Sequence, residues 1–256
     1  MSETSNSPMR SVHRAFSVLK TLELAQQPLR LTDLAQRAGF HLATTQRLVN
    51  VLVEQGYASR NSHGYTAGPA ALSTAHAFAT TSPLRLVARP VLEQLAAATG
   101  LTASLYVRIQ DTRVLIDRHE GGRRPEYSLP IGERLPLYPG AAGKAFLAAD
   151  DLTTAVGTAT GGAPSVRLAD GTVLDADEVR ADLTAAHEQG FAVSVNERQL
   201  GTTAVAALIT DVTDRPLGSL GLSGATSAMT DVHTSPLPGE VCRAARTIGA
   251  RVPAGG

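Results

Sequence analysis

Several features that define common classes of protein are rare in this 256-residue sequence or absent from it. It has no Trp, five Phe and five Tyr, so its core must be built from aliphatic and Ala side chains. Its one cysteine, Cys242, excludes an internal disulfide framework and a multi-cysteine zinc or iron–sulfur site. The longest apolar run, near residues 204–209, is far shorter than the roughly 20 residues that cross a bilayer. No apolar signal-peptide segment is visible, so we expect a soluble cytoplasmic protein.

The sequence also carries no net charge, because 23 Lys and Arg balance 23 Asp and Glu. The charges are unevenly placed, since residues 1–80 hold seven bases and four acids and the remainder has an excess of acids. A basic N-terminal part on an acidic larger part is typical of a DNA-binding module joined to a regulatory domain. Ordinary variation of surface charge would explain the same asymmetry.

The N-terminal part shows three short helical patterns and then a hairpin pattern. Residues 1–9 are polar, and we expect a disordered tail there. Val12, Phe16 and Leu19 recur with the spacing of one buried helix face. Thr32 is the expected N-cap of a second helix, which Gly39 ends. Residues 43–55 then predict a third helix that points Leu48, Val51 and Leu52 inward, and residues 57–67 predict a strand, a turn and a strand.

This order is typical of a winged helix-turn-helix, whose third helix can enter the major groove of DNA. The polar first turns of that helix would face bases and phosphates, and the hairpin, or wing, would face the backbone or the minor groove. A small helical domain that binds another protein is the alternative. The candidate DNA-binding residues are Arg14, Thr32, Thr44, Thr45, Gln46, Arg47, Asn50, Arg60 and His63.

After Gly100 the pattern changes to the period of two that predicts half-buried strands. Strands are expected at 101–109, 114–118, 126–131, 191–195, 203–210 and 217–223, and helices at 141–149, 175–189 and 234–251. We expect an α+β fold with a largely antiparallel sheet and a mobile loop at 157–171. The expected domains are residues 10–68 for DNA binding, 69–83 for a helical linker and 84–256 for the second domain.

Motifs for catalysis are weak. The segment Gly140-Ala-Ala-Gly-Lys144 lacks the spacing and the hydroxyl of a phosphate-binding loop, so its small residues predict close approach of backbone or ligand to a helix N-terminus, where an anion is favoured. The seven His are scattered without metal-ligand spacing, and no Ser has the context of a hydrolase nucleophile. Cys242 is expected to be a small core residue, and Glu197 and Arg198 to be solvated charges. No cofactor is expected.

Taken together, the motifs make the chain resemble the IclR family of bacterial transcriptional regulators over about residues 10–250. The matching stretches are residues 11–19, 31–35 with Gly39, 44–48, Gly56-Tyr57, 130–137, 143–145, Gly190-Phe191, Glu197 with Gly201, and 220–224. The resemblance implies an N-terminal winged helix-turn-helix and a C-terminal GAF-like domain that binds a small-molecule effector. It also implies homodimers or homotetramers that bind partly palindromic DNA operators.

The resemblance also places an effector site on specific residues, and it shows departures from the family pattern. The implied ligand-binding residues are Arg124, Tyr127, Ala141, Ala142, Ser194, Ala204, Gly221 and Ser223. Members that hold small keto acids have an acid, a thiol and a Ser where this chain has Ser194, Ala204 and Gly221. We therefore expect a roomier, less polar pocket for an aromatic acid or amide. The third helix departs too, at His41, Leu42, Ala43 and Thr45, so no operator sequence can be carried over.

The prediction is thus a ligand-responsive regulator, acting as a repressor rather than an enzyme. The alternatives are a small-carboxylate sensor that acts through protein partners without DNA, and an enzyme on small carboxylates.

Overall fold

The computed structural model describes residues 7–122 and 129–253. They form two compact units that are separated along the chain between Thr81 and Ser82. The first unit holds the helices and hairpin of the expected DNA-binding domain. The second holds the expected sheet, and each unit has a hydrophobic core of its own.

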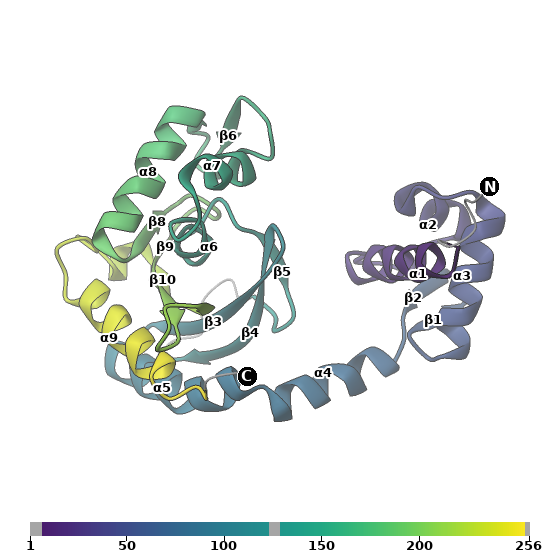
Figure 1. Cartoon of the computed structure of the whole chain (residues 1–256), viewed down its shortest axis with the longest axis horizontal. Coiled ribbons are helices and arrows are strands. Elements are labelled where there is room, and N and C mark those ends of the chain that lie inside the picture. The colour runs from purple at the N-terminus through teal and green to yellow at the C-terminus, as the bar shows by residue number, and fades with distance from the viewer. Residues whose placement is uncertain (1–6, 123–128, 254–256) are drawn as a thin grey trace. The chain divides into compact units, whose positions relative to one another are not determined.

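Three helices enclose the core of the N-terminal unit (Figure 1): α1 (Ser7–Glu23), α2 (Leu31–Ala38) and α3 (Leu42–Glu54). α1 begins within the expected disordered tail, so residues 7–9 are helical, while residues 1–6 lie outside the described part. α2 starts after Arg30, which makes no side-chain cap, and Thr32 lies inside its first turn rather than at the cap. Gly39 ends α2 with a φ of 73°, a left-handed conformation that favours glycine.

The burial of α1 differs from the expected face. Val18 and Leu22 are buried, whereas Val12 and Phe16 are 50% and 65% exposed. α1 thus carries two apolar stripes, each with the helical period of 3.6 residues, and only one of them packs inside this unit.

A hairpin and a fourth helix complete the unit. The strands β1 (Ala58–Asn61) and β2 (Gly64–Ala67) pair antiparallel. Tyr65 also exchanges backbone hydrogen bonds with Leu29, which attaches the hairpin to the turn before α2. The helix α4 (Ala70–Thr81), which the sequence predicted as a linker, has no buried residue.

In the second unit, the described residues contribute six strands to a curled antiparallel sheet in the order β5–β4–β3–β10–β9–β8 (Figure 1). The strands are β3 (Thr102–Ile109), β4 (Thr112–Glu120), β5 (Arg134–Pro136), β8 (Ala192–Val195), β9 (Thr202–Thr210) and β10 (Pro216–Ala225). The predicted strand at 126–131 is wrong for residues 129–131, which precede β5, and residues 126–128 lie outside the described part.

Helices cover both faces of this sheet. α5 (Pro83–Thr99) and α9 (Leu237–Gly249) pack on one side, called the α5 face. α6 (Ala141–Leu147) packs on the other side, called the α6 face, and α7 (Leu152–Thr160) and α8 (Ala176–Gln189) lie beyond it. The expected loop at 157–171 is partly ordered, because α7 continues to Thr160 and β6 (Ser165–Arg167) pairs with β7 (Val173–Asp175). The predicted α+β fold with a winged helix-turn-helix is confirmed.

Candidate functional site

The outer surface of α3 presents a small set of polar side chains. Arg47 and Asn50 are exposed, and Gln46 is half-buried between α3 and the wing. The Gln46 amide donates to Asn50 Oδ1 at 2.7 Å and to the Tyr65 hydroxyl at 3.2 Å. These bonds orient Gln46 before any partner binds, since both acceptors belong to packed elements.

Thr45 does not belong to this surface. It is fully buried, and its hydroxyl donates to the His41 carbonyl at 3.3 Å. Thr45, Val49 and Leu52 form the inward face of α3, whereas Val51, expected to be buried, is 52% exposed. The prediction of Thr45 as a DNA contact is therefore wrong, because the helix is rotated relative to the expected face.

The tip of the wing is held by its own polar groups. Asn61 Oδ1 accepts hydrogen bonds from the backbone amides of His63 and Gly64 at 2.9 and 3.0 Å. Arg60 lies 5.6 Å from the centre of the Tyr65 ring, within range of a cation–π contact. Arg60 and His63 are both exposed, and so reach solvent from a fixed hairpin.

A hollow of about 470 Å³ lies at the turn between α2 and α3. Its lining includes Arg14 of α1, His41 and Thr44 at the start of α3, and Phe40. The Arg14 guanidinium lies 5.7 Å from the Phe40 ring centre. Thr32 is exposed in the first turn of α2, where its hydroxyl is 3.5 Å from Asp33.

The sheet brings together the effector residues that the sequence predicted on separate strands. Ser194 pairs with Ala204, which pairs with Ser223 on its other side, so the three form one row across β8, β9 and β10. Gly221 lies two residues along β10 from Ser223. All four lie on the α6 face, because their neighbours along the strands belong to the core on the α5 face. Ala141 and Ala142 are buried in α6 on the same side.

Small residues at the start of α6 let a buried arginine approach. A Cβ atom at Gly143 would overlap the Leu137 carbonyl and the Arg113 guanidinium. Arg113 donates to the carbonyl groups of Leu137 at 2.8 Å and Pro139 at 3.2 Å. Burial lowers the pKa of Arg113 to about 10, so the side chain stays charged at neutral pH. The expected close approach to this helix is thus made by protein groups.

A buried ion-pair network holds the other side of α6. Lys144 is 1% exposed, and its Nζ lies 2.6 Å from Glu197 Oε1 and 3.0 Å from Asp182 Oδ2. Glu197 Oε2 accepts the Gly140 amide at 3.0 Å, and the Tyr138 hydroxyl donates to Asp182 at 2.9 Å. Burial raises the pKa of the Glu197 carboxyl despite the nearby Lys144. The expectation that Glu197 is solvated is wrong, and its carboxylate is the anion at the α6 N-terminus.

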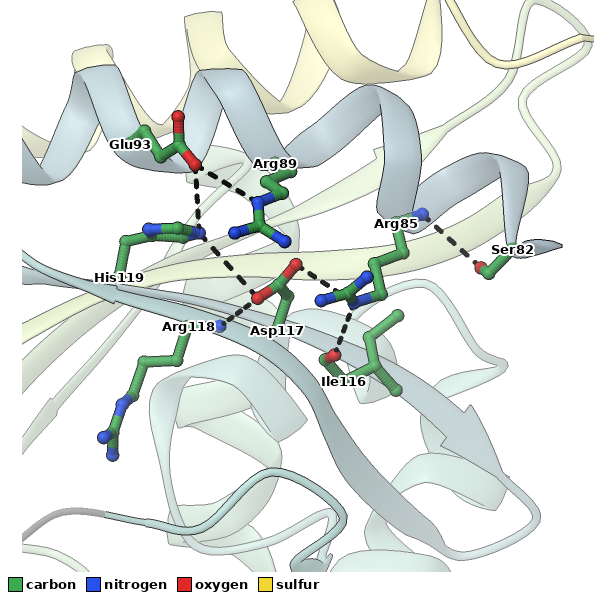
Figure 2. Close-up of polar contacts among 8 residues, drawn as sticks. All are labelled: Ser82, Arg85, Arg89, Glu93, Ile116, Asp117, Arg118 and His119. Carbon is green, nitrogen blue, oxygen red and sulfur yellow. Dashed lines mark hydrogen bonds and ion pairs between the residues drawn. The ribbon is translucent and has the colours of Figure 1, made fainter. Parts of the chain in front are cut away.

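Two of the predicted effector residues, Arg124 and Tyr127, lie outside the described residues. Another arginine of the same region, Arg118, was not singled out from the sequence. Figure 2 shows why it matters: Asp117 and His119 of β4 point toward α5, whereas Arg118 points to the opposite face of the sheet.

The side chains around Asp117 connect β4 to the first turn of α5 (Figure 2). Asp117 Oδ2 lies 3.1 Å from Arg85 Nε, and Arg85 also donates to the Ile116 carbonyl at 3.3 Å. His119 Nε2 lies 3.8 Å from Asp117 Oδ1 and 3.7 Å from Glu93. The first turn of α5, which begins at Pro83 just after the boundary between the units, is thereby fixed to the sheet.

Within the described ranges, no helix has the length and apolarity of a membrane span. No cluster of three or more His, Cys, Asp or Glu side chains there is placed to bind a metal ion.

A winged helix-turn-helix unit followed by a unit with a curled sheet and a small-residue face defines the class of two-domain transcriptional regulators with a sensor domain. Within that class, the chain belongs to the IclR family. The family model for the "Bacterial transcriptional regulator IclR C-terminal" domain matches residues 76–250, and that for the "IclR helix-turn-helix domain" matches residues 11–62. The matched families are regulators, not enzymes.

Individual relatives agree with this assignment. The acetate operon repressor of Salmonella typhimurium is 27% identical over 246 residues, which cover 94% of this chain and 89% of that protein. An IclR transcriptional regulator from Alicyclobacillus acidocaldarius has a TM-score of 0.80 and 26% identity, with 95% and 99% of the two chains covered. An IclR homologue from Microbacterium hydrocarbonoxydans complexed with 4-hydroxybenzoate shares the fold, with a TM-score of 0.74, 20% identity and coverage of 94% and 98%.

Proposed function

We propose that this chain is a repressor that binds a partly palindromic DNA operator and responds to a small organic acid. The observation that carries the DNA part is the exposed polar surface of α3, where Arg47 and Asn50 lie beside a Gln46 already oriented by the wing. Arg14, Thr44, Arg60 and His63 extend this surface on both sides of α3. An arginine at such a position can make a bidentate contact with guanine, which fixes both sequence and orientation.

Fluorescence anisotropy on the DNA upstream of the protein's own gene tests this proposal. Specific binding should exceed binding to scrambled DNA by at least about 10³-fold at physiological salt. Arg47→Ala should weaken specific binding by about 1–3 kcal/mol if Arg47 contacts a base. Arg246→Ala on α9 removes the same charge from the other unit and is the matched control.

Equal and weak binding to both DNAs would favour a sensor that acts through protein partners. The dependence on salt separates the two, because phosphate contacts release counterions and give a steep salt slope.

We infer further that the effector is an aromatic acid or a related amide, larger than a small keto acid and bound on the α6 face. The sheet positions there carry Ser194, Ala204 and Gly221, whose side chains are small and uncharged. The homologue complexed with 4-hydroxybenzoate makes that compound a suitable first probe. Isothermal titration should show binding of benzoate-type compounds in preference to pyruvate and glyoxylate, and tight binding of the keto acids alone would contradict this inference.

The active form is proposed to be a homodimer or homotetramer. Met9, Val12 and Phe16 are exposed at spacings of three and four residues, so they form one apolar stripe along α1. Leu72 and Phe78 on α4 are also exposed, and that helix buries none of its residues. Apolar surface of this extent on a small unit is typical of a protein interface, and a second copy would supply the two-fold symmetry that a palindromic operator requires.

Binding of the effector would then shift the oligomer between arrangements with different half-site spacing. The coupling required is modest, typically about 1–3 kcal/mol. The connector α5, which begins at the boundary between the units, is the proposed lever.

A further inference from the structure

Arg118 lies on the α6 face beside the predicted effector residues. It pairs with Ser104 of β3, which pairs with Gly221 of β10, so Arg118 ends a row of small residues across the sheet. The next row joins Thr102 to Ser223 and Ser223 to Ala204. Thr102, Ala204 and Ser223 are all part-exposed, so this is the open part of the α6 face.

Three other cations on this side of the sheet are held by contacts within the fold. Lys144 is held between two carboxylates, and Arg113 is buried against carbonyl groups at the start of α6. Arg108 makes a close ion pair with Asp150 at 2.7 Å. Arg118 is also paired with a carboxylate, but it differs from these cations in its place, because it borders the small-residue rows.

The contacts of Arg118 prepare it for a carboxylate. Its Nη1 donates to the Leu129 carbonyl at 2.6 Å, and its Nη2 lies 2.8 Å from Glu120 Oε1. The first bond fixes the orientation of the guanidinium. The second contact shows that Nη2 can donate to a carboxylate in this position, and Glu120 is itself part-exposed. A planar guanidinium has five N–H donors and binds carboxylates in pairs of parallel hydrogen bonds.

We propose that Arg118 anchors the carboxylate of the effector, which takes the Nη2 edge in exchange for Glu120. The ligand class is an organic monocarboxylate whose apolar part lies over the small residues of the α6 face. Thr102 and Ser223 offer hydroxyl groups beside it. This inference rests on the proposed effector function of the unit, and it names the chemistry that the site recognises.

Glu120 gives the proposal a signature that a purely structural arginine lacks. If the ligand competes with Glu120, removing the negative charge by Glu120→Gln should tighten the binding of acids. If Arg118 only supports the fold, the same substitution should weaken binding or leave it unchanged.

The test is isothermal titration of the full-length protein with benzoate, 4-hydroxybenzoate, pyruvate and glyoxylate, and with neutral benzamide. Arg118→Gln should weaken the best acid by about tenfold or more, the loss of one charge-assisted contact, and leave benzamide unchanged. Arg118→Lys, which keeps the charge, should recover part of the loss. Arg89→Gln, an exposed arginine on α5 that is also paired with a glutamate, is the control and should bind like wild type.

Three outcomes would overturn the proposal: equal acid affinity in Arg118→Gln and wild type, an equal loss for acids and benzamide, or no binding of any acid to wild type. If Arg118→Gln proves unfolded by circular dichroism, the acid affinities of Arg118→Lys and Glu120→Gln still test whether Arg118 binds the carboxylate. Operator binding without ligand is measured in parallel. Its failure in wild type would count against the DNA-binding proposal. Failure of every acid to bind wild type would also count against the proposed effector class, whereas the comparison of the Arg118 and Glu120 variants with wild type reports on Arg118 alone.

Discussion

Removing one partner of the ion pair between Asp117 and Arg85 should cost far more stability than removing one partner of the exposed Arg89–Glu93 pair within α5. The Asp117 side chain is 4% exposed and that of Arg85 is 14% exposed. Removing one partner of a buried pair leaves a charge without its counterion, at a cost of about 3–5 kcal/mol. Asp117→Ala should show that cost, because it also removes the acceptor for the Arg118 amide at 2.9 Å. Arg85→Ala should cost less, because Asp117 keeps that amide.

The matched control is the pair between Arg89 and Glu93, whose side chains are 52% and 50% exposed. Exposed pairs at this helical spacing contribute only about 0.3–0.5 kcal/mol. Because the chain lacks Trp, amide hydrogen exchange of β3 and β4 is the suitable assay, since the slowest amides report the unfolding free energy of the second unit.

A double-mutant cycle separates the pair from the other contacts of Asp117. The coupling energy between Asp117→Ala and Arg85→Ala should be about 0.5–3 kcal/mol, the range for residues in one ionic network. If Asp117→Ala costs no more than Arg89→Ala, burial does not strengthen this pair and the argument for a fixed start of α5 fails.

Four further outcomes are expected. Gly143→Ala should destabilise the protein by about 3 kcal/mol or more in thermal unfolding, because its Cβ would overlap the Leu137 carbonyl; an unchanged melting temperature would contradict this. Burial raises the pKa of Glu197 in the folded state, so its contribution to stability is largest at low pH and falls as the pH rises from the ordinary carboxyl pKa. The melting temperature of wild type relative to Glu197→Gln should therefore decrease with rising pH, and an increase would refute the direction. Thr45→Val should leave the operator affinity measured by anisotropy unchanged, because Thr45 is buried. A large loss of affinity would instead indicate that Thr45 contacts DNA. Phe16→Ser should reduce the oligomeric state in light scattering if α1 forms the dimer interface, and an unchanged mass would exclude that stripe.

The order of elements could be predicted from the sequence, because the spacing of apolar residues and the residues that begin or end helices are local signals. Gly39 and the predicted helix start at Asp175 give boundaries that the structure reproduces within a residue or two, with Asp175 as the N-cap of α8. Which stripe of a helix is buried could not be predicted as well. α1 carries two apolar stripes, and only packing against α2 and α3 decides that Val18 is inside and Phe16 outside. On α3, packing likewise places Thr45 in the interior and not on the surface.

The candidate sites show a similar division. The resemblance placed Ser194, Ala204 and Ser223 on one site, and the strand register joins them in one row. The environment of Glu197 was missed, because its partner Lys144 is 53 residues away in the sequence and nothing in the local pattern predicts the contact. Long-range ion pairs of this kind depend on how helices pack on the sheet.

A β-bulge in β4 explains why Arg118 was missed and why the strand can serve both faces of the sheet. Strict alternation puts Val114, Ile116 and Arg118 on one side. The register shifts between Leu105 and Tyr106, whose partners are Asp117 and Leu115, so Ile116 is an extra residue. After the bulge, side chains change faces: Asp117 meets α5 and Arg118 meets the α6 face. The Arg118 amide donates to the Asp117 carboxylate, so a ligand that moves the Arg118 backbone would act directly on the group that holds the first turn of α5. The proposed route from Arg118 to the first turn of α5 therefore consists of one peptide bond and the ion pair between Asp117 and Arg85.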